Sequence, residues 1–181
     1  ELAVMIKQAG IDFSNLEPSH YDSIMGDSTG AAVIFGATGG VMEAALRTAY
    51  EIVTGREVPF KNLEITPVRG MEGVKEATVK IEGCLEDWKF LEGAELKVAI
   101  AHGLVNANKI MRLVRDGKAP YHFVEIMACP GGCIGGGGQP IPTSMEIRKK
   151  RMKAIYSEDE HMVLRKSHEN PDVIAIYKEF L

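Results

Sequence analysis

The sequence predicts an α/β fold, with a mixed, partly parallel sheet flanked by helices and an extended helical belt at the C-terminal end. Short apolar runs alternate with segments of helical periodicity, as expected for a layered α/β domain. Pro140 and Pro142 separate this region from the last residues, which are too few to build a core alone. We therefore divide the chain into a main part, 1–140, and a C-terminal segment, 141–181, that packs on it.

The first part of the chain is expected to form a helix, a buried strand and a second helix. Leu2 and the apolar residues after it start the first helix, and the apolar run 31–35 is a candidate strand. Thr38 stands where it could cap a helix over 41–54, and Gly55 is expected to end that helix.

The remaining elements follow from periodicity and from glycine and proline punctuation. Ala77, Val79 and Ile81 alternate with polar residues, as in a strand with one buried face. Pro171 is suited to open the last helix. The expected elements are strands at 65–69, 77–82, 96–101 and 121–127, and helices at 104–115, 144–156 and 171–181.

The composition excludes several classes of protein. The chain has 181 residues, 45% of them hydrophobic, and a formal net charge of −4. This mixed, slightly acidic balance disfavours nucleic acid as a partner, and no apolar run is long enough to span a membrane. Three cysteines, two of them close together, do not resemble the disulfide framework of a secreted domain. A reducing compartment, and hence the cytoplasm, is expected.

The most informative segment is the glycine-rich stretch after the strand 121–127, which we call the cysteine loop (128–140). It places Cys129 and Cys133 around Pro-Gly-Gly, with more glycines behind them. A zinc ribbon needs two such pairs, and a redox Cys-x-x-Cys has two intervening residues rather than three. Because glycine permits close approach of the backbone, the loop indicates a soft metal centre whose sulfurs can accept bonds from backbone N–H groups.

The cysteine loop resembles the third cysteine motif of the catalytic domain of iron-only ([FeFe]) hydrogenases, nearly residue for residue over 127–140. The run 35–47, Phe-Gly-Ala-Thr-Gly-Gly-Val-Met-Glu-Ala-Ala-Leu-Arg, is similar to that family's pocket loop and following helix. The run 165–171, with Tyr177 and Phe180, is similar to its small-subunit-type C-terminal segment. The resemblance spans essentially the whole chain and implies the same belt-like C-terminal segment.

The resemblance implies a cofactor and a set of site residues. Cys129 would ligate a [4Fe-4S] cubane, and Cys133 would bridge it to a diiron subcluster carrying CO, cyanide and a dithiolate, which together form the H-cluster. Met127, Phe35 and Gly36 would line the diiron pocket, with Gly36 keeping the backbone close. The implied reaction is the reversible reduction of protons to H₂.

The resemblance also implies partners. A cubane usually takes four thiolates, whereas this chain has three cysteines, one of which, Cys84, lies far from the loop. The family's other cysteine motifs, its proton-relay cysteine and its relay acids would lie upstream of Glu1. The chain is therefore expected to be the C-terminal part of a hydrogenase catalytic domain, inactive by itself. Its expected partners are the upstream part of that domain and a ferredoxin or an NAD(P)-linked electron-transfer module.

Two other functional interpretations remain open from the residues. The cysteine loop would also suit a hydrogenase-like iron–sulfur assembly factor without enzymatic activity, and the chain could be a cofactor-free structural piece. On periodicity alone, Met127 and Phe35 are core side chains rather than pocket walls.

Several residues are given no role in the site. The run 33–40 has the strand–glycine–helix order of a dinucleotide-binding fingerprint, but Val41 and Met42 stand where a further glycine is needed. Cys84 is interpreted as a structural thiol, and the scattered histidines show no metal-ligand spacing. Glu125, on the strand, is not expected to relay protons.

Overall fold

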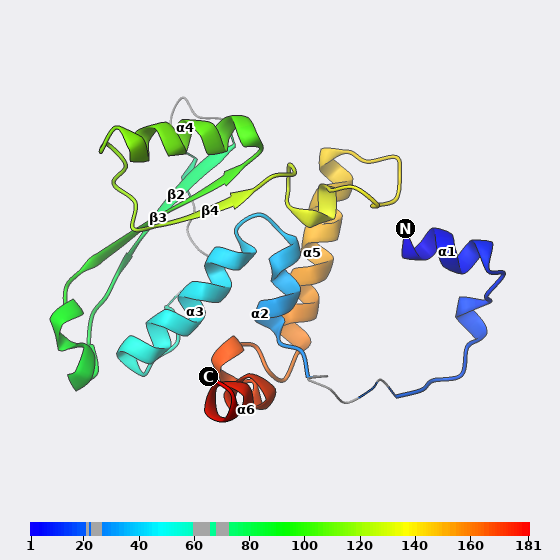
Figure 1. The fold of residues 1–181 in the computed structure, drawn as a ribbon, viewed down its shortest axis with the longest axis horizontal. Helices are drawn as coiled ribbons and strands as arrows, with labels where there is room; N and C mark the ends of the chain where they lie inside the picture. Colours follow the sequence, from blue (N-terminus) through cyan, green and yellow to red (C-terminus); the bar gives the residue numbers. More distant parts are fainter. Residues whose placement is uncertain (21, 23–26, 60–65, 68–72) are drawn as a thin grey trace.

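The computed structural model describes residues 1–20, 22, 27–59, 66–67 and 73–181. The described residues form a four-stranded sheet in the order β1 (Thr66–Pro67), β2 (Val74–Lys80), β3 (Glu95–His102) and β4 (Phe123–Met127). β1–β2 and β2–β3 are antiparallel, whereas β3–β4 is parallel. Helices α3 (Gly40–Thr54) and α4 (Leu104–Arg115) cover opposite faces (Figure 1), so the predicted mixed α/β class is confirmed.

The alternation of side chains along β2 and β3 explains the two covered faces. Ala77 and Val79 on β2, with Val98 and Ile100 on β3, point to one face and pack against α3. Residues of opposite parity, including Val74 and Ala101, point to the other face, where Ile110 of α4 packs. The helix α4 also supplies the crossover that parallel strands require, and it brings β4 beside β3.

The predicted strand at 31–35 is wrong. Residues Gly30–Val33 form the short helix α2, followed by the 3₁₀ turn η2 (Ile34–Gly36). The side chain of Thr29 accepts a hydrogen bond from the N–H of Ala32 and so caps α2. The apolar run is buried against helices rather than in the sheet, since Ala31 and Ile34 pack with Ala44 of α3.

The helix at 41–54 is confirmed, but its expected cap is not. The N-cap of α3 is Gly39, with φ 94°, and not Thr38. The Thr38 hydroxyl is buried and has no hydrogen-bond partner within the described part of the chain. Gly55 ends α3 in the left-handed region, with φ 66°, as predicted.

The other expected elements are found with shifted ends. The first helix, α1, is Leu2–Gln8, and α4 has the predicted bounds. Of the strand expected at 65–69, only Thr66–Pro67 is seen, and 65, 68 and 69 lie outside the described residues. In the C-terminal segment, α5 is Met145–His161, longer than expected, η5 is Ser167–Glu169, and α6 is Pro171–Glu179.

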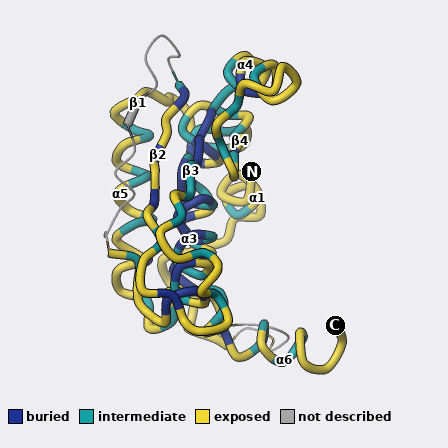
Figure 2. Tube along the Cα trace, turned by 90° about the vertical axis from the view of Figure 1, so that its left-hand side faces the viewer, coloured by how far each residue is buried: buried dark blue, intermediate teal, exposed yellow. Residues whose placement is uncertain are grey.

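The C-terminal segment packs along one end of the main part as a helical belt, as predicted. Helix α5 lies beside α2, on the side of α3 away from α4 (Figure 1), and buried residues concentrate in the sheet and α3 (Figure 2). Backbone hydrogen bonds also join the belt to the main part: the N–H groups of Gly30 and Ala31 donate to the carbonyls of Leu164 and Arg165. No helix in the described ranges is long and apolar enough to cross a membrane.

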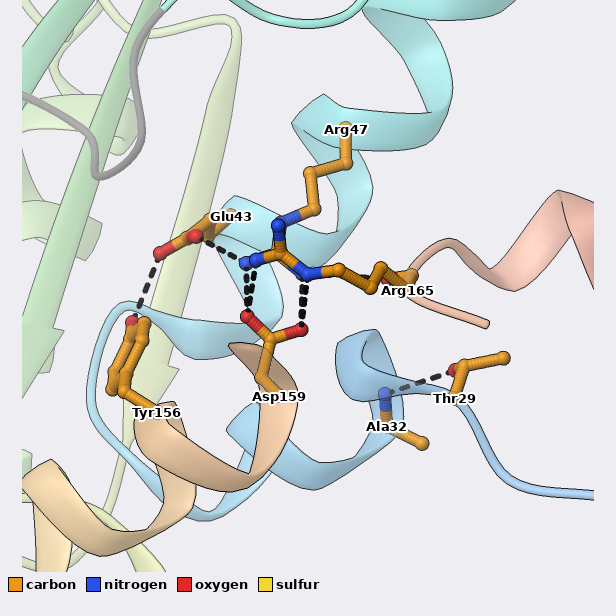
Figure 3. Close-up of polar contacts among 7 residues, drawn as sticks. All are labelled: Thr29, Ala32, Glu43, Arg47, Tyr156, Asp159 and Arg165. Carbon is orange, nitrogen blue, oxygen red and sulfur yellow. Dashed lines mark hydrogen bonds and ion pairs between the residues drawn. The ribbon is translucent and has the colours of Figure 1, made fainter. Parts of the chain in front are cut away.

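A buried ion-pair network joins the belt to α3 (Figure 3). Asp159 of α5 is 1% exposed, and its two carboxylate oxygens accept from Arg47 at 2.7 and 2.8 Å. Arg165 donates to the same carboxylate at 2.7 Å. Arg47 also reaches Glu43 at 2.6 Å, and the Tyr156 hydroxyl donates to Glu43 at 2.9 Å.

The network satisfies a carboxylate that could not otherwise be buried. Burial alone raises the pKa of Asp159, but the hydrogen bonds from Arg47 and Arg165 outweigh it and hold this pKa below its ordinary value. Gly30 makes room for the carboxylate, because a Cβ at this position would collide with Asp159 Oδ1. The belt is therefore docked by a specific charged group fitted into a space that a glycine leaves.

Replacing Asp159 tests this docking. Asp159→Asn should lower the free energy of unfolding by about 3–5 kcal/mol, because it removes the buried carboxylate that Arg47 and Arg165 share, and of these two arginines Glu43 contacts Arg47 alone. The control is the exposed neighbour Glu158: Glu158→Gln should change the free energy of unfolding by less than about 0.5 kcal/mol. Because the native pKa is lowered, the carboxylate stabilises the protein fully above pH ~4 and progressively less below it. Urea unfolding at several pH values should show the free energies of unfolding of the wild type and Asp159→Asn converging in acid. A difference that stays constant with pH would contradict the role of the network.

Candidate metal centre

The cysteine loop leaves the end of β4 and turns back tightly on itself. The N–H of Gly132 donates to the carbonyl of Cys129 at 3.0 Å, and the N–H of Gly136 donates to that of Cys133 at 3.0 Å. Cys133 opens the 3₁₀ turn η4 (Cys133–Gly135). Both thiols are free, with Cys129 partly buried and Cys133 exposed. Two accessible thiols on one compact loop are a donor set that suits a soft metal or an iron–sulfur cluster.

The cysteine loop is in direct backbone contact with the pocket loop (35–40). The N–H of Thr38 donates to the carbonyl of Gly131 at 3.1 Å. Gly132 is buried with φ 92°, and a Cβ there would lie 2.7 Å from the Gly36 oxygen and 2.8 Å from the Thr38 nitrogen. Only glycine fits this position, because it tolerates both the positive φ and the close approach. The two loops that the sequence singled out are therefore brought together.

The predicted pocket residues occupy different surroundings. A Cβ at Gly36 would lie 3.8 Å from the side chain of Ile134, which is part of η4. Met127 ends β4 half-buried, and its carbonyl accepts from the N–H of Gly103 at 2.8 Å. Phe35 is 46% exposed and lines a shallow apolar groove with Ala45 of α3 and its neighbours. Gly36 thus lies against the cysteine loop, whereas Phe35 borders a groove on the outer side of α3.

Glu125 holds the pocket loop, a role that the sequence analysis missed. Its carboxylate is 6% exposed and accepts from the N–H of Gly39 at 2.7 Å and from that of Met42 at 2.7 Å. It thereby caps the start of α3 from the neighbouring strand, in place of Thr38. Burial raises the pKa of Glu125, although the two N–H donors oppose the shift. The only signal in the sequence was an acidic residue within an apolar strand.

The other titratable groups do not extend the site. Cys84 is buried, and burial followed by the Glu92 carboxylate raises the pKa of its thiol, which suits the structural role predicted. Elsewhere in the described residues, Glu51, His168 and Glu169 lie close enough to hold a metal ion. The ammonium of Lys166 lies 2.6 Å from Glu51 and 3.1 Å from Glu169. The protein's own lysine therefore already neutralises these carboxylates.

The fold and the loop together define an α/β domain that presents two free thiols on a glycine-built turn. Comparison with protein families identifies the lineage: residues 1–137 match the model "Iron only hydrogenase large subunit, C-terminal domain" and residues 145–181 match "Iron hydrogenase small subunit". The chain belongs to the iron-only hydrogenase family, as the resemblance predicted.

Individual relatives agree with this assignment. The chain is 48% identical to the NADP-reducing hydrogenase subunit HndD of Solidesulfovibrio fructosivorans, covering 100% of this chain and 29% of the relative. It is 43% identical to iron hydrogenase 1 of Clostridium pasteurianum, covering 99% of this chain and 30% of the relative. A solved structure of a variant of [FeFe]-hydrogenase HydA1 from Chlamydomonas reinhardtii aligns with TM-score 0.79 and 42% identity, over 100% of this chain and 49% of that one.

The chain thus spans about a third of these curated relatives and half of the solved one. Iron–sulfur assembly proteins are also related, but more distantly. Protein NAR1 of Arabidopsis thaliana is 30% identical over 100% of this chain and 37% of its own length.

Adding one methyl group to the turn tests whether its shape depends on Gly132. Gly132→Ala, made in a protein that joins this chain to the rest of a hydrogenase catalytic domain, should abolish most iron incorporation at this site, because the Cβ collides with the backbone of the pocket loop. Gly137→Ala is the matched control, since nothing lies within 4 Å of a Cβ there. Iron and sulfide are measured per chain after anaerobic reconstitution. Equal iron content in the two variants would show that the close packing of the loops is dispensable.

Proposed function

We propose that the chain forms the C-terminal part of a hydrogenase catalytic domain, in which Cys129 and Cys133 hold the cubane end of an H-cluster. The observation that carries the proposal is the turn that presents both thiols while Gly132 packs on the pocket loop. The donor set fits the group, because thiolates are the ligands that iron–sulfur clusters require. The bound cluster supplies the chemistry of 2H⁺ + 2e⁻ ⇌ H₂.

The chain's own residues would then bind and shape the cofactor. Cys129 would ligate the cubane, and Cys133 would bridge it to the diiron subcluster. Gly36 would let the backbone approach the cluster, and Met127 would line the apolar wall and exclude water, joined by Phe35 from the edge of the groove along α3. Glu125 fixes the pocket loop against β4, so these groups are positioned before the cofactor binds.

The proposed partners follow from the share of each relative that the chain covers. A segment equivalent to the half of the solved relative that this chain does not cover would supply further thiolates. The apolar groove along α3, which Phe35 lines, would pack against that segment. Electrons would come from a ferredoxin or an NAD(P)-linked module; the relative HndD is an NADP-reducing hydrogenase subunit. We also propose two structural units, 1–140 and 141–181, and a cytoplasmic location.

The runner-up is an iron–sulfur assembly factor, which the relationship to protein NAR1 supports. The identity to hydrogenases of 43–48% is well above the 30% for NAR1, which favours the enzyme.

Exchanging cysteines in the full-length parent tests the site. Cys133→Ser should abolish hydrogen evolution, because one thiolate would no longer link the two subclusters. Cys84→Ser is the control and should retain nearly all activity, since this buried thiol lies outside the cysteine loop. Hydrogen evolution is measured by gas chromatography with a reduced dye as donor. Equal losses in both variants would show that the cysteines are misassigned.

The 181-residue chain by itself is proposed to be inactive. Two thiolates do not anchor a cubane that takes four, so reconstitution under argon should give no stable four-iron cluster and no hydrogen. Iron analysis and EPR of the dithionite-reduced protein, on a gel-filtration fraction of known oligomeric state, check this. Near-stoichiometric four-iron loading of a monomer would overturn it.

A further inference from the structure

We propose that Arg148 and Arg151 of α5 are positioning residues for the cysteine loop, and that the Arg148 charge raises the reduction potential of the cluster bound there. The inference rests on the proposed function, because it concerns the cluster that Cys129 and Cys133 would hold. It assigns part of the electronic control of the centre to the C-terminal segment, which contributes no thiolate.

Arg151 closes the second half of the cysteine loop. One terminal nitrogen donates to the carbonyl of Ile134 at 2.8 Å and the other to the carbonyl of Pro140 at 2.8 Å. Ile134 directly follows Cys133. The planar guanidinium therefore fixes the separation of two carbonyls at opposite ends of the glycine run, which has few side chains of its own to hold it.

Arg148 lies over the turn that carries both thiols. A Cβ at Gly131 would lie 3.4 Å from Arg148 Cδ, and one at Gly135 would lie 2.8 Å from Arg148 Nε. These glycines stand on either side of Cys133 in the sequence. The absence of a side chain at Gly135 is what lets the arginine approach the turn this closely, whereas a Cβ at Gly131 would make only ordinary contact with the arginine stem.

The positive charges of these arginines are not neutralised by a neighbouring acid. Within the described residues, neither Arg148 nor Arg151 forms an ion pair, whereas Lys150 on the same helix pairs with Glu146 at 2.9 Å. Arg148 Nε is also buried and has no hydrogen-bond partner among the described residues. An unpaired buried donor is costly, so its placement against the turn that carries both cysteines points to an anionic occupant of the site.

The expected electrostatic effect has a definite sign. A cluster held by thiolates becomes more negative when it takes up an electron, and a nearby positive charge stabilises that reduced state. Removing the Arg148 charge should therefore make the cluster harder to reduce. If Arg148 only held the helix in place, replacing it would alter the stability or the iron content of the protein. It would not change the reduction potential of the cluster at equal cluster loading.

The test is an EPR-monitored redox titration of the full-length parent after iron–sulfur reconstitution. The signal followed is the one that Cys133→Ser removes, so other clusters do not contribute. At the wild-type midpoint potential, Arg148→Met should lower the ratio of reduced to oxidised cluster by about threefold or more. Arg148→Lys should restore most of it by returning the charge. Lys149→Met removes an exposed charge one residue away and should leave the ratio nearly unchanged.

Arg151 is tested in the same titration. Arg151→Lys keeps the charge but loses the two-pronged bond, so it should lower iron content or change the EPR line shape. Wild-type iron content and spectra in Arg151→Lys and Arg151→Met would remove Arg151 from the proposal.

The outcomes separate this inference from the proposed function. A wild-type protein without a Cys133-dependent signal would overturn both. A wild-type ratio in Arg148→Met, or an equal shift in Lys149→Met, would overturn the inference and leave the proposed function standing. If Arg148→Met fails to bind iron, the titration uses Arg148→Gln, in which the side chain stays polar without the charge, and a wild-type ratio there is equally decisive.

Discussion

The structure depends on the burial of one carboxylate, that of Asp159, between two arginines. The belt buries little apolar surface against the main part, since α6 has no buried residue and Asp159 is the one buried residue of α5. A carboxylate without partners could not enter this site, because desolvation would favour its neutral form. Arg47 from α3 and Arg165 from the belt make its burial possible. The main part and the belt are therefore matched by charge as much as by apolar packing.

The same device, a buried carboxylate satisfied by groups distant in sequence, organises the other side of α3. Glu125 lies on β4, immediately before the cysteine loop, and accepts from the two backbone N–H groups at the start of α3. Its bonds join positions 86 and 83 residues apart, so this side chain fixes the start of α3 to the strand from which the cysteine loop leaves, in addition to the direct bond from Thr38 to Gly131. Helix α3 is thus held by acids at two places, Glu125 near its start and Asp159 through Arg47.

Most of the sheet could be predicted from the sequence, because its pattern is local. Ala77 and Val79 alternate with polar neighbours, and Gly55 marks a helix end through its own backbone preference. The prediction of a strand at 31–35 fails because five apolar residues in succession carry no period that separates a strand from a buried helix. Thr29, which caps α2, was the local signal that could have corrected it. The cap of α3 could not be found this way, since its acceptor, Glu125, belongs to another element.

Helix α5 contacts the cysteine loop, lies against the pocket loop and contributes Asp159 to the ion-pair network. Near its start, Arg148 and Arg151 contact the cysteine loop, and further along Ile155 lies where a Cβ at Gly36 would meet it at 3.6 Å. Asp159 follows Arg151 by two helical turns, which is about 12 Å along the axis. One rigid helix therefore spans the cysteine loop, the pocket loop and the ion-pair network. A unit boundary near position 140 describes the order of the chain, but the surroundings of the two thiols are built from both sides of it.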